Sequence, residues 1–488
     1  MSLRHKLLAI LLCVSLFAPP PRAQAYSLLT HEQLIDLTWE SSIVPLLLSR
    51  YPTLTPAEIE HARAFAYGGC VIQDIGYYPF GDQFFSNLTH YVRTGDFVVN
   101  LFRNAGNADE LAFAVGALSH YIGDSIGHSE ATNLSVPIEF PKLAARYGSS
   151  VNYAEGEHQH VQTEFAFDID EIAHNRFAPV HYLRHIGLAI PTKQLALAFY
   201  QTYGLREDFT DTHHSRINVS TYRFAVHGFI PRVAYATTLL HRRHEPADID
   251  SPDLKRLTAE IAKVAAKNDW DAYRHKPGIG TYSLAGLLFI LPKVGPIKLV
   301  SVKGPTAETN ARYIHSVLAS TDALSYALHR FTPPPPTAPS AAIAAAADSQ
   351  KSPAPSDAVP AILTHYQSAI NQLRDPSHPL NNRDLDTGYP VQPAGYSLTD
   401  KTYATLLHRL AETPATPIPP GIKRDILAYY ANLELHFATK KDPAAWATLQ
   451  QDLTTLQTMP TSTDPIPYPT YGDGSGDSPP NATTPSAP

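Results

Sequence analysis

Apolar residues recur at helical spacing along most of the chain between residues 26 and 331. Helices are predicted to begin after three capping positions, which are Thr55, Asn107 or Asp109, and Ser251. At Thr55 and Ser251 the next residue is a proline, which is favoured in the first turn of a helix. No series of alternating apolar and polar residues, the pattern of half-buried strands, interrupts these segments. The pattern therefore predicts an all-α fold, built as a multi-helix bundle.

Composition changes further along the chain and suggests separate parts. Residues 332–360 are rich in proline, alanine and serine, which indicates a linker that is stiff where proline is dense. Residues 361–458 return to helical spacing and predict a smaller C-terminal helical module. Residues 459–488 are mostly Pro, Thr, Ser, Gly and Asp, so we expect a disordered tail. The main helical domain is then residues 26–331, preceded by a removable segment at residues 1–25.

The first 25 residues have the pattern of a signal peptide. Arg4 and Lys6 precede an apolar run, Leu7–Phe17, and Ala23–Ala25 form a small-x-small cleavage site. The apolar run is about 11 residues long, whereas a membrane-spanning helix needs roughly 20. We therefore expect cleavage before Tyr26 and a secreted or periplasmic protein.

Charge and cysteine content narrow the function classes. The chain has 38 Lys and Arg residues against 45 Asp and Glu residues, a net charge of −7. Loss of residues 1–25 would remove three basic residues and no acidic one, which gives −10. This balance argues against a broad basic surface for nucleic acid. Cleavage would also remove Cys13 and leave Cys70 as the only thiol, so no disulfide can form within the mature chain.

Two sets of chemically active residues lie on predicted helices. His120, Asp124 and His128 are each four residues apart, so on a helix they share one stripe. His160 and Glu164 repeat the four-residue step further along. Imidazole and carboxylate groups are zinc ligands, and a helix holds such side chains at the short separations that coordination needs. These five residues therefore predict a metal site.

Three more residues upstream are candidates, although each has an ordinary interpretation when taken alone. His31 reads as a helix cap, Asp74 as a turn residue, and His90 as part of a solvated face. Their order along the chain, ahead of the two helical sets, changes that interpretation.

The ordered pattern resembles the zinc-dependent phospholipases C, a family whose ligand order and all-helical fold are shared by the zinc-dependent single-strand nucleases of fungi. The matching positions are Tyr26, His31, Asp74, His90, His120, Asp124, His128, His160 and Glu164. The resemblance covers roughly residues 26–190 and does not extend past the linker.

The resemblance implies two or three zinc ions. Their ligands would be Asp74, His90 and His120 for the first, His128, His160 and Glu164 for the second, and His31 with the amine and carbonyl of Tyr26 for the third, with Asp124 shared between the first and third. Zinc lowers the pKa of a bound water towards about 7, so no nucleophilic Ser or Cys is needed. Asp74 is the candidate catalytic residue that orients or deprotonates this water. We expect a phosphodiesterase, a phospholipase C that hydrolyses glycerophospholipids to diacylglycerol and a phosphorylated headgroup.

Two alternatives stay open at this point. One is a single-strand nuclease on the same scaffold, and the other is a non-catalytic, metal-stabilised binding protein whose module at residues 361–458 contacts a partner. A phospholipid substrate allows for contact with a membrane surface, whereas nucleic acid is a partner only under the first alternative. We also expect residues 332–488 to be dispensable for hydrolysis, because every candidate ligand precedes residue 165 and the linker offers few contacts.

Overall fold

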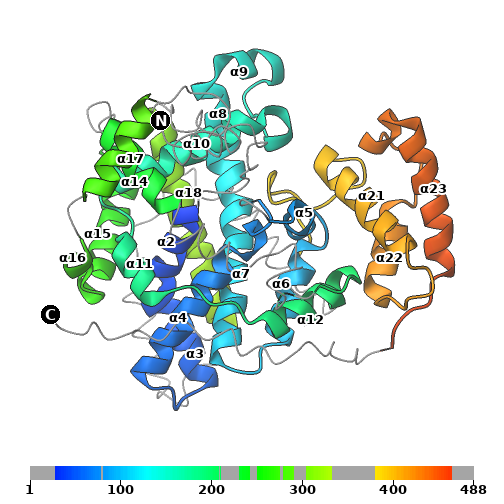
Figure 1. Cartoon of the computed structure of the whole chain (residues 1–488), viewed down its shortest axis with the longest axis horizontal. Helices are drawn as coiled ribbons and strands as arrows, with labels where there is room; N and C mark the ends of the chain where they lie inside the picture. The colour runs from blue at the N-terminus through cyan, green and yellow to red at the C-terminus, as the bar shows by residue number, and fades with distance from the viewer. Residues whose placement is uncertain are drawn as a thin grey trace, which may run out of the picture.

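The computed structural model describes residues 28–77, 81–207, 209, 230–241, 250–274, 278–290, 304–331 and 380–463 (Figure 1). Every regular element in these ranges is a helix, accompanied by two isolated β-bridges. The expected all-α fold class is confirmed. The predicted signal peptide, Tyr26 and the predicted linker lie outside the described residues, as do residues 361–379 and 464–488 of the predicted module and tail.

A long helix, α7 (Ala108–Gly127), runs through the middle of the main body (Figure 1). It packs against α2 (Leu28–Thr38), α4 (Pro56–Cys70), α6 (Thr94–Arg103) and α18 (Ala307–Phe331). Because α7 is surrounded in this way, 18 of its 20 residues are buried. Side chains on α7 therefore meet side chains from several helices in the buried interior.

The remaining helices cover this centre. Those from the first half of the sequence are α3 (Val44–Arg50), α5 (Gln83–Tyr91), α8 (Asn133–Glu139), α9 (Pro141–Tyr147), α10 (Tyr153–Ala173), α11 (Val180–Ile186) and α12 (Thr192–Tyr203). Further along the chain they are α14 (Ile230–His241), α15 (Pro252–Lys267), α16 (Trp270–Tyr273) and α17 (Ile279–Ile290). Short π- and 3-10 helices are η1 (Trp39–Ile43), η2 (Ile72–Asp74), η3 (His128–Thr132) and η7 (Ala438–Lys441). Among the described helices, none combines the length and the apolar character that a membrane crossing requires.

The three helix starts expected from the sequence are observed. Thr55 Oγ1 accepts a hydrogen bond from the Glu58 amide, and Ser251 Oγ accepts one from the amide of Leu254. At the start of α7 the cap is Asn107, whose Oδ1 accepts from an amide at 2.9 Å, and not Asp109. Each cap satisfies an amide that the helix itself leaves unpaired.

The crossing of α4 and α7 depends on glycine. A Cβ on Gly116 would lie 2.2 Å from the carbonyl oxygen of Ala66, and one on Gly69 would lie 2.0 Å from that of Phe113. Both contacts are with backbone atoms, so an added methyl group would force the helices apart. The two glycines thus set the distance between α4 and α7, the helix that carries His120.

The C-terminal part contains α21 (Ser397–Ala411), α22 (Pro420–Tyr429) and α23 (Pro443–Thr458), seen in orange and red at one side of the molecule (Figure 1). The predicted tail begins too early at residue 459. Met459 is 2% exposed, and Ser462 donates an amide hydrogen bond to the carbonyl of Ile418. These contacts keep the chain against the module up to the last described residue.

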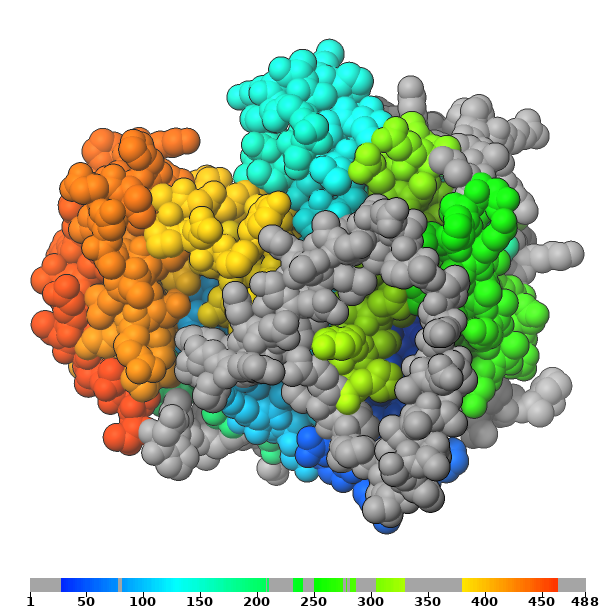
Figure 2. Space-filling model, turned by 180° about the vertical axis from the view of Figure 1, so that it is seen from behind, coloured from blue at the N-terminus to red at the C-terminus, as the bar shows by residue number. Residues whose placement is uncertain are grey.

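Residues 380–396 connect this module to the main body. From behind, they lie between the orange C-terminal helices and the cyan region of α8 and α9 (Figure 2). Thr94 Oγ1 donates to the carbonyl of Arg383 at 2.9 Å, and the Tyr121 hydroxyl donates to that of Asn381 at 2.7 Å. The predicted linker lies outside the described residues, but residues 380–396, which follow it, bond directly to α6 and to α7, the helix that carries His120 and Asp124.

Candidate metal centre

Eight of the nine predicted ligands come together in the interior, and the ninth, Tyr26, lies outside the described residues. Six secondary-structure elements supply them: α2 (His31), η2 (Asp74), α5 (His90), α7 (His120 and Asp124), η3 (His128) and α10 (His160 and Glu164). All eight side chains belong to residues that are at most 3% exposed. Their ligand atoms form three groups, within each of which the atoms lie within 4.8 Å of one another: His31, His120 and Asp124; Asp74, His90 and His120; and His128, His160 and Glu164.

The first two groups meet at Asp124. Its Oδ1 lies 3.2 Å from His31 Nε2, and its Oδ2 lies 3.0 Å from His120 Nε2. The same Oδ2 is 3.3 Å from His90 Nε2, which is also 3.3 Å from Asp74 Oδ1. The rings of His31 and His120 stack with their centres 4.1 Å apart. One carboxylate thus faces three imidazoles, which is the arrangement expected if it is shared between two ions.

The third group joins the end of α7 to α10. Glu164 Oε1 lies 3.1 Å from His128 Nε2 and 2.9 Å from His160 Nε2. His160 and Glu164 are one turn apart on α10, as their spacing predicts. His128 opens the π-helical turn η3, directly after α7 ends at Gly127. The chain therefore changes from α-helical to π-helical geometry at His128, a member of the third group.

Hydrogen bonds at Nδ1, the ring nitrogen that points away from the candidate metal groups, orient three of the histidines. The Nδ1 atoms of His90, His120 and His128 lie 2.7, 2.9 and 2.9 Å from the carbonyl oxygens of Ser86, Cys70 and Leu385, respectively. A carbonyl oxygen can only accept, so each Nδ1 carries the proton. Each Nε2 then presents its lone pair to the interior, the tautomer that metal-binding histidines adopt.

The residues present fit a metal ion. His90 Nε2 and His120 Nε2 lie 3.3 Å apart, so in this tautomer two lone pairs would face each other unless a cation binds them. The carboxylate oxygens of Asp74 and Asp124 are buried and, among the described residues, have no hydrogen-bond donor of good geometry other than these imidazoles. Imidazole nitrogen and carboxylate oxygen are the donors that zinc accepts in proteins.

The protonation equilibria of the metal-free site show the same need for positive charge. Burial raises the pKa of Asp74 to about 6, although the neighbouring His120 and His90 act against this rise. Burial acts in the same direction on Asp124, but His120 and His128 outweigh it and hold the pKa of that carboxyl well below its usual range. Burial lowers the pKa of His90, yet its contacts with Asp124 and Asp74 prevail and raise it to about 10. Protons on imidazoles thus balance the carboxylates, and a metal ion would have to displace them.

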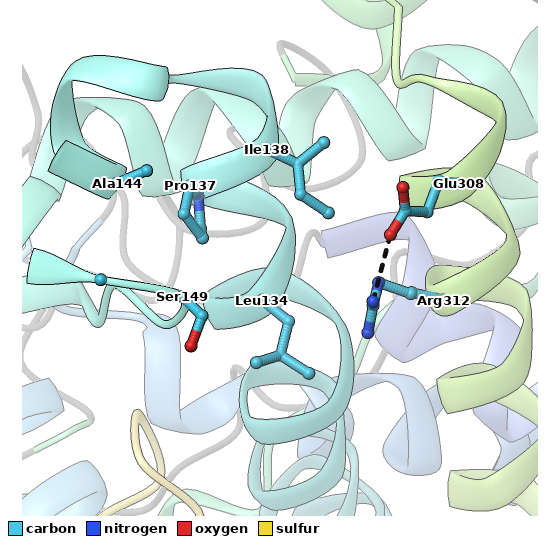
Figure 3. Close-up of a pocket in the computed structure, with 8 residues that line it drawn as sticks. Leu134, Pro137, Ile138, Ala144, Ser149, Glu308 and Arg312 are labelled. Carbon is cyan, nitrogen blue, oxygen red and sulfur yellow. Dashed lines mark hydrogen bonds and ion pairs between the residues drawn. The ribbon is translucent and has the colours of Figure 1, made fainter.

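A pocket of about 500 Å³ lies elsewhere, between α8, α9 and α18 (Figure 3). One side is apolar, and the other carries an ion pair in which Arg312 Nη2 lies 3.2 Å from Glu308 Oε1. The apolar residues are Leu134, Pro137, Ile138 and Ala144. None of the eight candidate ligands lines this pocket, so it is separate from the metal groups.

Sequence reasoning missed the contribution of residues 380–396. The Leu385 carbonyl bonds to His128, and the carboxylate of Asp386 is buried nearby with Oδ1 3.9 Å from the same Nδ1. A main-chain carbonyl has no residue signature, and these residues follow Glu164 by more than 200 positions. No spacing rule based on side chains could have found them.

This chain has the fold and the donor set of a helical metalloprotein. Residues 30–208, less than half of the chain, match the sequence profile of the family described as zinc dependent phospholipase C. The family resemblance found in the order of the ligands is confirmed. All eight candidate ligands of the described structure lie within the match, whereas residues 380–396 lie outside it. No curated protein and no solved structure matches the chain significantly.

Proposed function

We propose that this protein is a secreted zinc-dependent phosphodiesterase that hydrolyses glycerophospholipids to diacylglycerol and a phosphorylated headgroup. The observation that carries the proposal is the set of three adjoining groups of buried imidazoles and carboxylates within the region that matches the family. We propose two or three zinc ions, because there are three groups but His120 belongs to two of them.

The chain's own residues have distinct parts in the proposed reaction. When bound, zinc supplies Lewis-acid chemistry, which lowers the pKa of water and offsets charge on a phosphoryl group. Asp74 is the proposed catalytic residue: its carboxylate orients the attacking water and accepts its proton. The carbonyls bonded to His90 and His120 fix the direction of both rings, so the ligand atoms are in place before substrate binds.

The deciding experiment compares the hydrolysis of phosphatidylcholine and of single-stranded DNA by purified protein that carries its natural mature terminus. We expect diacylglycerol release from phosphatidylcholine, loss of that activity with a chelator, and recovery when zinc is added. An Asp74→Asn variant that keeps its zinc should lose at least about 100-fold in rate, since it lacks the proton acceptor.

Other results would replace the proposal. Zinc-dependent cleavage of single-stranded DNA without lipid hydrolysis would identify a nuclease. Bound zinc without either activity would identify a metal-stabilised binding protein, and absence of zinc from the wild-type protein would contradict all three. Sequencing the amino terminus of protein from the culture medium tests secretion, and Tyr26 is the expected first residue.

A further inference from the structure

A single residue of the C-terminal part, Leu385, joins two elements that carry candidate ligands. Its amide donates a hydrogen bond to the carbonyl of His90 at 3.1 Å, and its carbonyl accepts one from His128 Nδ1 at 2.9 Å. His90 belongs to one metal group and His128 to another. Leu385 thus bridges the two groups through its backbone.

Asp386 anchors this bridge from the next position. Its Oδ2 accepts hydrogen bonds from the hydroxyls of Tyr91 at 2.9 Å and Tyr396 at 2.7 Å, and its carbonyl accepts one from Asn133 Nδ2 at 2.7 Å. Tyr91 follows His90 in sequence, and Asn133 follows η3. Asp386 is 1% exposed, and a buried carboxylate is tolerated only where donors replace its lost hydration. These donors therefore fix the position of the segment relative to both ligand-bearing elements.

Gly388 brings the same segment against α7. Its φ is +73°, and a Cβ there would lie 2.3 Å from the carbonyl oxygen of Ser125, the neighbour of Asp124. Only glycine combines this backbone conformation with so close an approach. The segment therefore touches the immediate surroundings of His90, Asp124 and His128.

We infer that residues 380–396 are a positioning element of the metal centre, which holds His128 in the tautomer and direction needed to bind the ion of the His128, His160 and Glu164 group. The inference rests on the proposed zinc site. The Leu385 carbonyl accepts from Nδ1 of His128, and the Asp386 carboxylate lies 3.9 Å from the same nitrogen, so residues of this segment favour a proton on Nδ1 and leave Nε2 to face Glu164. The other two groups keep their own orienting carbonyls, at Ser86 and Cys70, so the effect is expected at one ion.

The test uses the full-length, zinc-loaded protein and counts the ions retained at rising chelator concentration. Asp386→Ala removes the anchor, and Tyr396→Phe removes one of its donors and preserves the ring. Asp425→Asn is the matched control, because Asp425 accepts a hydrogen bond from the Tyr403 hydroxyl at 2.8 Å within the same module. We expect one ion per chain to leave the Asp386→Ala variant at a chelator concentration about 10- to 100-fold lower than in the wild type. The Tyr396→Phe variant should show a smaller shift in the same direction, and the control should show none.

The outcomes separate this inference from the proposed function. If the wild type and both variants release zinc alike, the inference is overturned and the proposed function stands. If Asp425→Asn loosens the ion equally, the effect is general destabilisation and the positioning role is overturned. A wild type without zinc overturns both proposals. Should Asp386→Ala fail to fold, as judged by its thermal melt, the zinc retention of Tyr396→Phe decides.

Discussion

At the scale of single residues, the two acids at the ends of the metal centre face different numbers of imidazoles. Among the described residues, Asp124 faces His31, His90 and His120, whereas Glu164 faces His128 and His160. Removing the charge of each acid therefore affects different parts of the same site.

We predict that Asp124→Asn loses more bound zinc than Glu164→Gln. Asp124 belongs to the His31 group and also lies 3.3 Å from His90 of the adjoining group, so an amide at position 124 should weaken both, whereas an amide at position 164 should weaken the third group. Elemental analysis of each purified variant gives the ion count per chain. Equal losses from both variants would show that Asp124 is not shared.

The amino terminus gives a second prediction at this scale. The family resemblance implies that the free amine and carbonyl of Tyr26 would complete the ion near His31, and an added residue would turn that amine into an amide, a far poorer donor. A protein with one extra Ser before Tyr26 should lose one ion and most of its activity. Zinc content and lipid hydrolysis are compared with those of the native terminus, and identical values for both proteins would exclude Tyr26 as a ligand.

Asp384 gives a prediction about pH. Burial, with Asp386 and Asp400 nearby, raises its pKa to about 7, although the Thr399 hydroxyl bonds to it. The folded protein therefore binds a proton that the unfolded chain has already released, so this group's contribution to stability is full below about pH 4 and is lost as pH rises through about 7. Between about pH 5 and about pH 8 the wild type should lose roughly 3 kcal/mol more unfolding free energy than Asp384→Asn. Denaturant unfolding at both pH values checks this, and parallel losses in the two proteins would contradict it.

At the scale of elements, the glycines where α4 crosses α7 affect both the packing of the two helices and the orientation of the His120 ring. The Cys70 carbonyl at the end of α4 accepts from His120 Nδ1, so the separation of the two helices sets the direction of a ligand.

We predict that Gly116→Ala destabilises the fold by about 3 kcal/mol and loosens bound zinc. The new methyl group would meet backbone atoms of Ala66 and Cys70 at 2.2 and 2.7 Å, and these cannot move away cheaply. Gly286→Ala in α17 is the control, since nothing lies within 4 Å of its Cβ position. The control should be neutral or more stable by up to about 1 kcal/mol, because alanine is the better helix former. Similar melting temperatures for both variants would refute the close-packing argument.

At the scale of the whole molecule, the spacing of residues in the sequence predicted the features that depend only on neighbouring residues of the chain. The steps from His120 to Asp124 and from His160 to Glu164 fix shared helix faces, and the cap at Thr55 marks a helix start, so these features could be predicted. The π-helical turn at His128 could not, because a helix and a π-turn share almost the same pattern of apolar residues. The bridge through Leu385 could not either, because it consists of main-chain atoms brought in by the fold of a distant segment.

The backbone bridge at Leu385 also has a consequence for the order of synthesis. A ribosome that has reached residue 331 has already made every candidate ligand side chain, but it has not yet made the carbonyl that His128 faces. On our inference, a nascent or prematurely ended chain would display the complete ligand signature and still hold one ion weakly. Full metal loading would then be a late event, possible only once residues 380–396 have been translated and have folded back onto α5 and η3.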